Sequence, residues 1–110
     1  MDTVLINVAL GRQPADVIIR GGNLINVYTG EIYQTDVAIK GDKIASIGPL
    51  NMGTYGPDTK IIDAQGLYLA PGFIDAHIHV ESSMLTYTEF SKMVIKHGTT
   101  AVASDLMEIT

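Results

Sequence analysis

The spacing of apolar residues along this chain of 110 residues changes near residue 71. Before that point, short apolar runs are separated by polar or glycine-containing turns roughly every 8–12 residues, a spacing typical of a small β-sheet or sandwich. A hairpin is the clearest element, with strands Asp36–Lys40 and Lys43–Ile47 on either side of the turn Gly41–Asp42. A short helix over residues 3–10 is expected ahead of the strands. Further short strands are predicted at residues 17–20, 24–28, 31–33, 61–63 and 67–69, with a loop at 51–58.

After residue 71 the order becomes strand, loop, helix, strand. An apolar strand is predicted over 73–79, and Thr86–Glu89 fits the S/T-x-x-E capping box that opens a helix. Phe90, Met93 and Val94 would form the buried stripe of that helix. Small and β-branched residues then predict a buried strand over Thr99–Ser104. Because parallel strands need such a crossover, we expect an α/β fold with a β-rich N-terminal part, and domains 1–70 and 71–110.

The composition narrows the possible partners. Seven basic residues against twelve acidic ones give a net charge of −5, which argues against a nucleic-acid or anionic membrane surface. The chain has no Cys, so disulfides and thiolate metal sites are excluded. No apolar run is long enough to span a bilayer, and Asp2 stands where a signal peptide would be basic. We therefore expect a cytoplasmic protein without membrane or nucleic-acid partners.

The candidate chemistry lies in the second part, at His77 and His79. Alternate residues of a strand project from the same side, so both imidazoles would aim at one point if 73–79 is a strand. Two ligands of a single metal ion need this arrangement, and zinc-like ions accept neutral imidazole. An isolated His-x-His pair is weak evidence, because most such pairs are surface or packed histidines. The flanking Pro71–Gly72 and the polar exit after His79 strengthen the metal interpretation.

Several polar residues near the two histidines are further candidates. Asp75 shares their face and could accept a hydrogen bond from a ligand imidazole, or only hold the base of the strand. Glu81 could orient water or substrate, and Ser82 could line the pocket; a solvated loop is the competing interpretation. Asp105 and Glu108 follow the second strand, at the strand ends where barrel enzymes keep their active sites. His97 is expected only to cap the C-terminal end of the helix.

The run 71–85 resembles the first barrel strand of the amidohydrolase superfamily, and its part Glu81–Leu85 (ESSML) resembles adenine deaminases. Further similarity to that family lies at residues 12–16, 26–31, 41–45 and 97–100. The resemblance implies half of a small β-sandwich followed by the first βαβ portion of a (β/α)8 metallohydrolase barrel. It also implies a divalent metal ion (manganese, iron or zinc), a purine as small-molecule substrate, and the conversion of adenine and water to hypoxanthine and ammonia.

The sequence also departs from the family. Tyr87 stands where the family has Pro, and Leu106–Ile109 (LMEI) replaces Pro-His-Glu-Ile, so that Met107 occupies the place of a His that it cannot replace as ligand or proton carrier. A complete barrel needs roughly 250 residues. We therefore expect the N-terminal portion of a larger enzyme, incomplete and inactive by itself, whose unpaired strands favour a homo-oligomer. Two alternatives are a cyclic-amide hydrolase of the dihydropyrimidinase or dihydroorotase kind, which the residues Glu81–Met84 disfavour, and a non-catalytic remnant.

Overall fold

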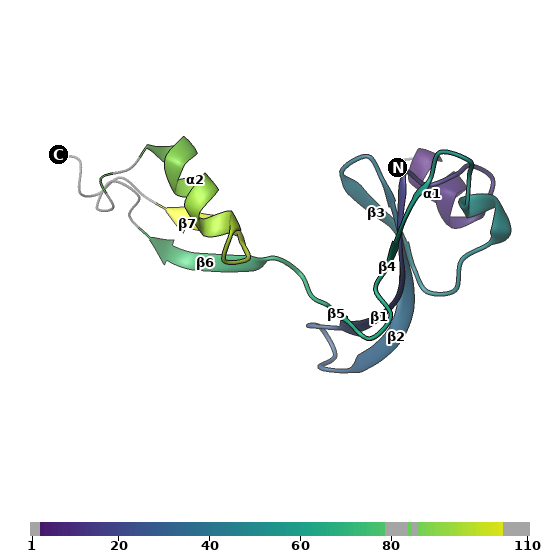
Figure 1. The fold of residues 1–110 in the computed structure, drawn as a ribbon, viewed down its shortest axis with the longest axis horizontal. Helices are drawn as coiled ribbons and strands as arrows, with labels where there is room; N and C mark the ends of the chain where they lie inside the picture. Colours follow the sequence, from purple (N-terminus) through teal and green to yellow (C-terminus); the bar gives the residue numbers. More distant parts are fainter. Residues whose placement is uncertain (1–2, 79–83, 85, 105–110) are drawn as a thin grey trace. The chain divides into compact units, whose positions relative to one another are not determined.

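A computed structural model describes residues 3–78, 84 and 86–104 of the protein, with the backbone alone at 75–78, 87 and 102–104. The chain divides into two compact units, residues 1–70 and 71–110. The elements are α1 (Thr3–Ala9), β1 (Val17–Ile25), β2 (Ile32–Lys40), β3 (Lys43–Ile47), the 3-10 helix η1 (Met52–Thr54), β4 (Lys60–Asp63), β5 (Tyr68–Leu69), β6 (Phe73–Ile78), α2 (Tyr87–Ile95) and β7 (Thr99–Ser104) (Figure 1). Neither helix of this described part is long and apolar enough to cross a bilayer.

The first unit is built on one mixed sheet in the order β3-β2-β1-β4, with β5 also paired to β1. Strand β2 is antiparallel to both β1 and β3, whereas β4 and β5 run parallel to β1. The predicted hairpin is confirmed, because Lys40 pairs with Lys43 across the turn. Gly41 adopts a φ of +61°, the left-handed conformation that such tight turns need at their first central position.

Gly21 and Gly22 do not separate two strands, as the sequence suggested, but form a bulge inside the continuous strand β1. The register of β1 on β2 shifts between Ile19 and Gly22, and Gly21 has a φ of +72°. The N–H of Gly21 donates instead to the Asp36 carboxylate, at 2.8 Å. The Asp36 side chain thus replaces the missing partner in the ladder, and the pairing of β1 with β2 resumes at Gly22. Strand β2 is therefore also continuous, where two separate strands were predicted.

The predicted strands at 61–63 and 67–69 exist as β4 and β5, and each pairs with β1. One other prediction for the first unit needs correction. The predicted loop at 51–58 contains η1, whose Thr54 is completely buried. The hydroxyl of Thr54 donates to the Val8 carbonyl at 2.9 Å, near the C-terminal end of α1. This buried hydrogen bond fixes a segment that lacks any periodic pattern in the sequence.

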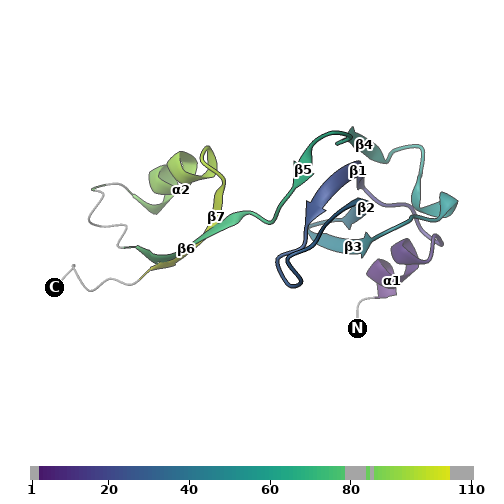
Figure 2. The ribbon, with the colours of Figure 1, turned by 90° about the horizontal axis from the view of Figure 1, so that it is seen from below.

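Helix α1 covers one face of the sheet, where it packs against β3 and β2 (Figure 2). The buried cluster on this face consists of Val8, Ala15, Ile18 and Ala38, with Ala45, Leu50 and Tyr55 packed around it. Ile18 and Ala38 are paired neighbours on β1 and β2, so both point to the helix side. The alternate residues of the same strands must therefore face the other way.

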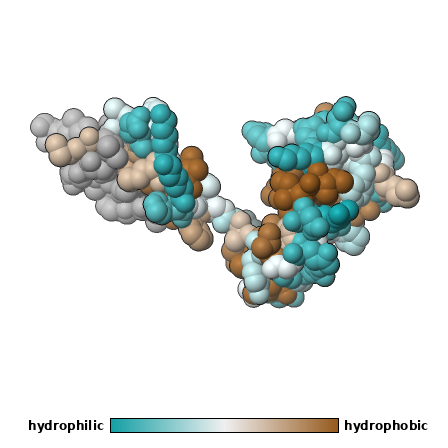
Figure 3. All heavy atoms as spheres, in the orientation of Figure 1, coloured by the Kyte–Doolittle hydropathy of each residue, from teal (hydrophilic) through white to brown (hydrophobic). Residues whose placement is uncertain are grey.

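The sheet face opposite α1 is also apolar, and much of it is exposed. Its residues lie in rows of paired neighbours across the strands: Ile47, Val37, Ile19 and Ile62 in one row, and Ile44, Ile39 and Val17 in the next. Exposure reaches 42% at Ile62, 48% at Ile47 and 59% at Ile44. Figure 3 shows hydrophobic residues gathered over β4 in this unit. We call these seven residues the isoleucine face.

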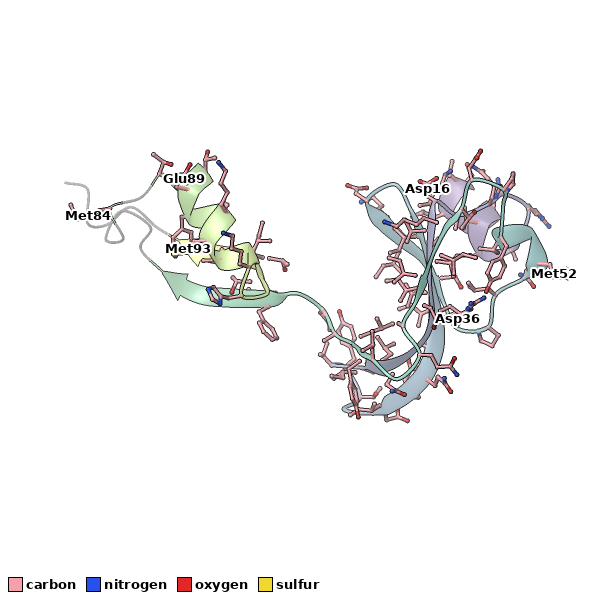
Figure 4. All side chains as sticks on the ribbon, in the orientation of Figure 1. Asp16, Asp36, Met52, Met84, Glu89 and Met93 are labelled. Carbon is pink, nitrogen blue, oxygen red and sulfur yellow. The ribbon has the colours of Figure 1, made fainter. Side chains whose placement is uncertain are left out.

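In the second unit, β6 and β7 are parallel neighbours joined through α2. Thr86 is the N-cap of α2, and its hydroxyl accepts from the Glu89 N–H at 3.2 Å, which confirms the predicted cap. Phe90 is buried as expected, but Met93 is 44% exposed, so the predicted stripe is wrong at that position. Helix α2 packs on β7, and Met93 is labelled on this helix in Figure 4.

Candidate metal centre

His77 lies in β6, one residue before the C-terminal end of that strand. The last paired residues of the two parallel strands are Ile78 of β6 and Ser104 of β7. The carboxyl ends of both strands therefore meet at one edge. In α/β folds this edge is where ligands bind and where barrel enzymes keep their catalytic residues.

The other predicted site residues are only partly within the described range. For Asp75 and His77 only the backbone is described, so the directions of their side chains are not known. That the two histidines share one face therefore stays a prediction. The remaining candidates lie outside the described residues: His79, Glu81, Ser82, Asp105 and Glu108. The same is true of Met107. In the sequence, His79 and Asp105 directly follow Ile78 and Ser104, the pair that ends the ladder.

His97 lies at the opposite end of β6 from His77. It is exposed in the turn after α2, where its N–H donates to the Val94 carbonyl at 3.0 Å. The next residue, Gly98, accepts from the N–H of Phe73, the first residue of β6, at 2.8 Å. His77 is four positions after Phe73 in the strand, a distance of about 13 Å at roughly 3.3 Å per residue. His97 therefore cannot share a metal ion with His77, in keeping with a role at the helix end.

The donor chemistry at the carboxyl edge suits a divalent metal. Imidazole is a good ligand for zinc, iron and similar ions. His77 lies in a strand, so its backbone is held in place by the neighbouring strand. Among the described side chains, which do not include that of His77, no three His, Cys, Asp or Glu residues gather into a metal site. A hollow between α2 and β7 is lined by Phe90, Val94, Ile95 and residues 99–101, together with Ser91. Its lining offers only apolar groups and hydroxyls, so it does not compete with the carboxyl edge.

The segment that contains this geometry is similar to known proteins. A model of the amidohydrolase family matches residues 60–105, which include His77, His79 and both strands of the parallel pair. The adenine deaminase of Moorella thermoacetica is 52% identical over 105 residues, and that of Mesorhizobium japonicum 52% identical over 110. The chain is thus similar to adenine deaminases over nearly all of its own length, and to the amidohydrolase family over residues 60–105. These alignments cover 96% and 99% of the chain but only 17% and 18% of the two relatives.

Solved structures similar to this chain include a D-aminoacylase, an N-acyl-D-glutamate deacylase and a D-hydantoinase. A D-aminoacylase is 32% identical with a TM-score of 0.66, and the alignment covers 83% of this chain and 18% of the aminoacylase chain. The N-acyl-D-glutamate deacylase of Bordetella bronchiseptica, solved with zinc, is 28% identical with a TM-score of 0.63 over 82% of this chain and 18% of its own. A D-hydantoinase from Thermus sp. is 30% identical with a TM-score of 0.59 and covers 80% and 20%.

Proposed function

We propose that this chain contributes the first metal-binding strand of an adenine deaminase, which converts adenine and water to hypoxanthine and ammonia. The observation that carries the proposal is the position of His77 at the carboxyl end of a parallel strand, within the segment that matches the amidohydrolase family. The identity to adenine deaminases over nearly the whole chain favours adenine over other amidohydrolase substrates.

His77 and His79 would hold one divalent ion, manganese, iron or zinc, through neutral imidazole nitrogens. Such an ion supplies a Lewis acid that makes water a nucleophile near neutral pH. Around it, Glu81 and Ser82 would bind and orient the purine, and Asp105 and Glu108 would present carboxylates from the end of the neighbouring strand. The pairing of Ile78 with Ser104 supports this grouping, because the two described strands end at the same edge.

The fold proposal completes each unit with further strands. We infer that the first unit is half of a β-sandwich and that the second opens a (β/α)8 barrel, with its remaining strands supplied by a complete enzyme. The isoleucine face supports the sandwich, because inward-facing positions of a sandwich are apolar on both sheets. The parallel pair β6 and β7 joined through α2 supports the barrel.

The 110-residue chain alone should have negligible adenine deaminase activity. Two imidazoles leave an ion with too few protein ligands, because catalytic sites normally use at least three. A general acid that protonates the leaving ammonia is also required, and none is assigned in this chain. Ammonia release from adenine by the pure, metal-loaded chain, lost in His77→Ala, would contradict this expectation.

A chimaera tests the proposed function directly. Residues 1–110 would replace the matching segment of the Moorella thermoacetica adenine deaminase, and ammonia release from adenine would be measured with bound metal. We expect an active enzyme, in which His77→Ala or His79→Ala lowers kcat/KM by more than about 100-fold. Removing a group that only hydrogen-bonds a metal ligand already costs about 10–100-fold, so removing the ligand itself should cost more. His97→Ala is the matched control and should leave kcat/KM within about threefold, because His97 lies at the opposite end of β6.

Met107 provides a second arm of this experiment. The family has His at this place, so Met107→His in the chimaera should preserve or raise activity. If both chimaeras fold and bind metal but neither deaminates adenine, the proposal is wrong. Turnover of dihydrouracil instead of adenine would favour the cyclic-amide hydrolase, the class suggested by the structural similarity to a hydantoinase.

A further inference from the structure

The amino edge of the β6–β7 pair contains a very close contact between Gly72 and Thr100. A Cβ atom added at Gly72 would overlap the Oγ1 and Cγ2 atoms of Thr100 and lie 2.7 Å from its Cβ. Real Cβ atoms do not approach other atoms this closely, so only glycine fits at position 72 while Thr100 keeps its place. Sequence patterns treat Pro71–Gly72 simply as the entry to a strand and give no sign of this contact.

Thr100 is also the residue at which the register of the two strands shifts. Phe73 pairs with Thr99, but Ile74 pairs with Ala101, so Thr100 is one extra residue on β7. Its hydroxyl donates to the Phe73 carbonyl at 3.4 Å. Such bulges are found next to active sites, where they change the direction of side chains further along the strand.

Phe73 is held on its other side by Gly98. The Phe73 N–H donates to the Gly98 carbonyl at 2.8 Å. The ring lies against Gly98, where an added Cβ would be 3.1 Å from the Phe73 Cδ2 atom. Gly72, Phe73, Gly98 and Thr100 thus form one clamp at the start of β6, which we call the strand clamp.

We propose that Gly72 and Thr100 are positioning residues, which fix the register of the first part of β6 on β7 and so help to place His77 at the carboxyl edge. A second register shift lies between Asp75 and Ile78, so the clamp sets where β6 starts on β7 and this second shift adjusts its last residues. A slip of one residue moves every side chain of a strand to the opposite face, so His77, one residue before the end of β6, depends on this register. The positioning role rests on the proposed metal centre. The clamp itself rests only on contacts among the described residues.

Three variants of the 110-residue chain test the clamp: Gly72→Ala, Thr100→Gly and the double variant. The measurements are amide hydrogen exchange in β6 and the Kd for Zn²⁺ from calorimetric titration. We expect Gly72→Ala to speed exchange across β6 and to raise the Zn²⁺ Kd at least about tenfold, the effect typical of losing an outer partner of a metal ligand. The double variant should recover both properties to the level of Thr100→Gly, because the overlapping side chain is gone.

Phe90→Leu serves as the control for simple destabilisation. Phe90 is buried on α2, outside the clamp, so its truncation should lower the free energy of unfolding without changing the Zn²⁺ Kd of the folded chain. The inference is overturned if the double variant shows the same fast exchange in β6 and the same weak Zn²⁺ binding as Gly72→Ala. If Gly72→Ala does not fold, the inference is overturned when the double variant does not fold either. If the parent chain binds no Zn²⁺, the proposed metal centre fails, while hydrogen exchange in β6 still decides whether the clamp sets the register.

Discussion

At the scale of single residues, Asp16 connects the start of β1 to the hairpin turn (Figure 4). Its carboxylate accepts from the Gly41 N–H at 2.8 Å and from the Lys40 ammonium at 3.0 Å. The hydrogen bond from Gly41, followed by that from Lys40, lowers the pKa of Asp16 below its ordinary value of 3.8. The ionised form of Asp16 therefore stabilises the folded state.

The prediction at this scale concerns pH. Because the folded pKa is lowered, the contribution of Asp16 is complete above pH 3.8 and is lost as the pH falls through the folded pKa. Asp16→Asn should thus lower the free energy of unfolding at pH 7, and its difference from the parent should shrink in strong acid. Urea denaturation across this pH range measures both. Asp42→Asn removes a carboxylate from the same turn but leaves both hydrogen bonds of Asp16 in place, so it is the control and should change the free energy of unfolding at pH 7 less than Asp16→Asn. An Asp16→Asn difference that stays constant with pH would contradict the assignment.

At the scale of elements, β5 is held against β1 by a close approach at Gly22. A Cβ atom at Gly22 would lie 2.6 Å from the Leu69 Cγ and 3.2 Å from the Ala64 Cβ. Gly22→Ala should therefore destabilise the first unit by about 1–3 kcal/mol, the usual cost of overpacking. Chemical denaturation measures this change. In a Leu69→Ala background the same substitution should cost clearly less, and equal costs in the two backgrounds would show that the contact with Leu69 does not matter.

At the scale of the whole molecule, the isoleucine face predicts association of the 110-residue chain. Exposed apolar surface of this kind recruits other chains, and fully burying an isoleucine is worth about 1.5–3 kcal/mol. We expect oligomers or aggregates in sedimentation at micromolar concentration, and a shift toward monomer in the variant Ile44→Lys/Ile62→Lys. The control Val27→Lys/Tyr28→Lys removes two apolar residues that are even more exposed but lie outside this face, and it should leave association unchanged. A monomeric parent chain would contradict the prediction.

Local patterns in the sequence determined several elements correctly. The hairpin turn at Gly41, the helix cap at Thr86 and the strand Thr99–Ser104 all follow from residues within a few positions of each other. The position of His77 in a strand follows in the same way, whereas its role as a metal ligand stays a prediction. The amidohydrolase resemblance was also readable from short motifs, and comparison with relatives confirmed it.

Only the tertiary structure decided the features that depend on residues distant in sequence. Gly21 looked like a strand end because the sequence does not reveal that the Asp36 carboxylate receives its N–H. The partner of strands β4 and β5 was not apparent from the sequence, because both pair with β1, which is distant from them along the chain. The requirement for glycine at position 72 arises from Thr100, which is 28 positions away (100 − 72) and reaches it only through the pairing of β6 with β7. Local propensity fixes where a strand can form, whereas its register and neighbours are set by contacts that exist only in the folded chain.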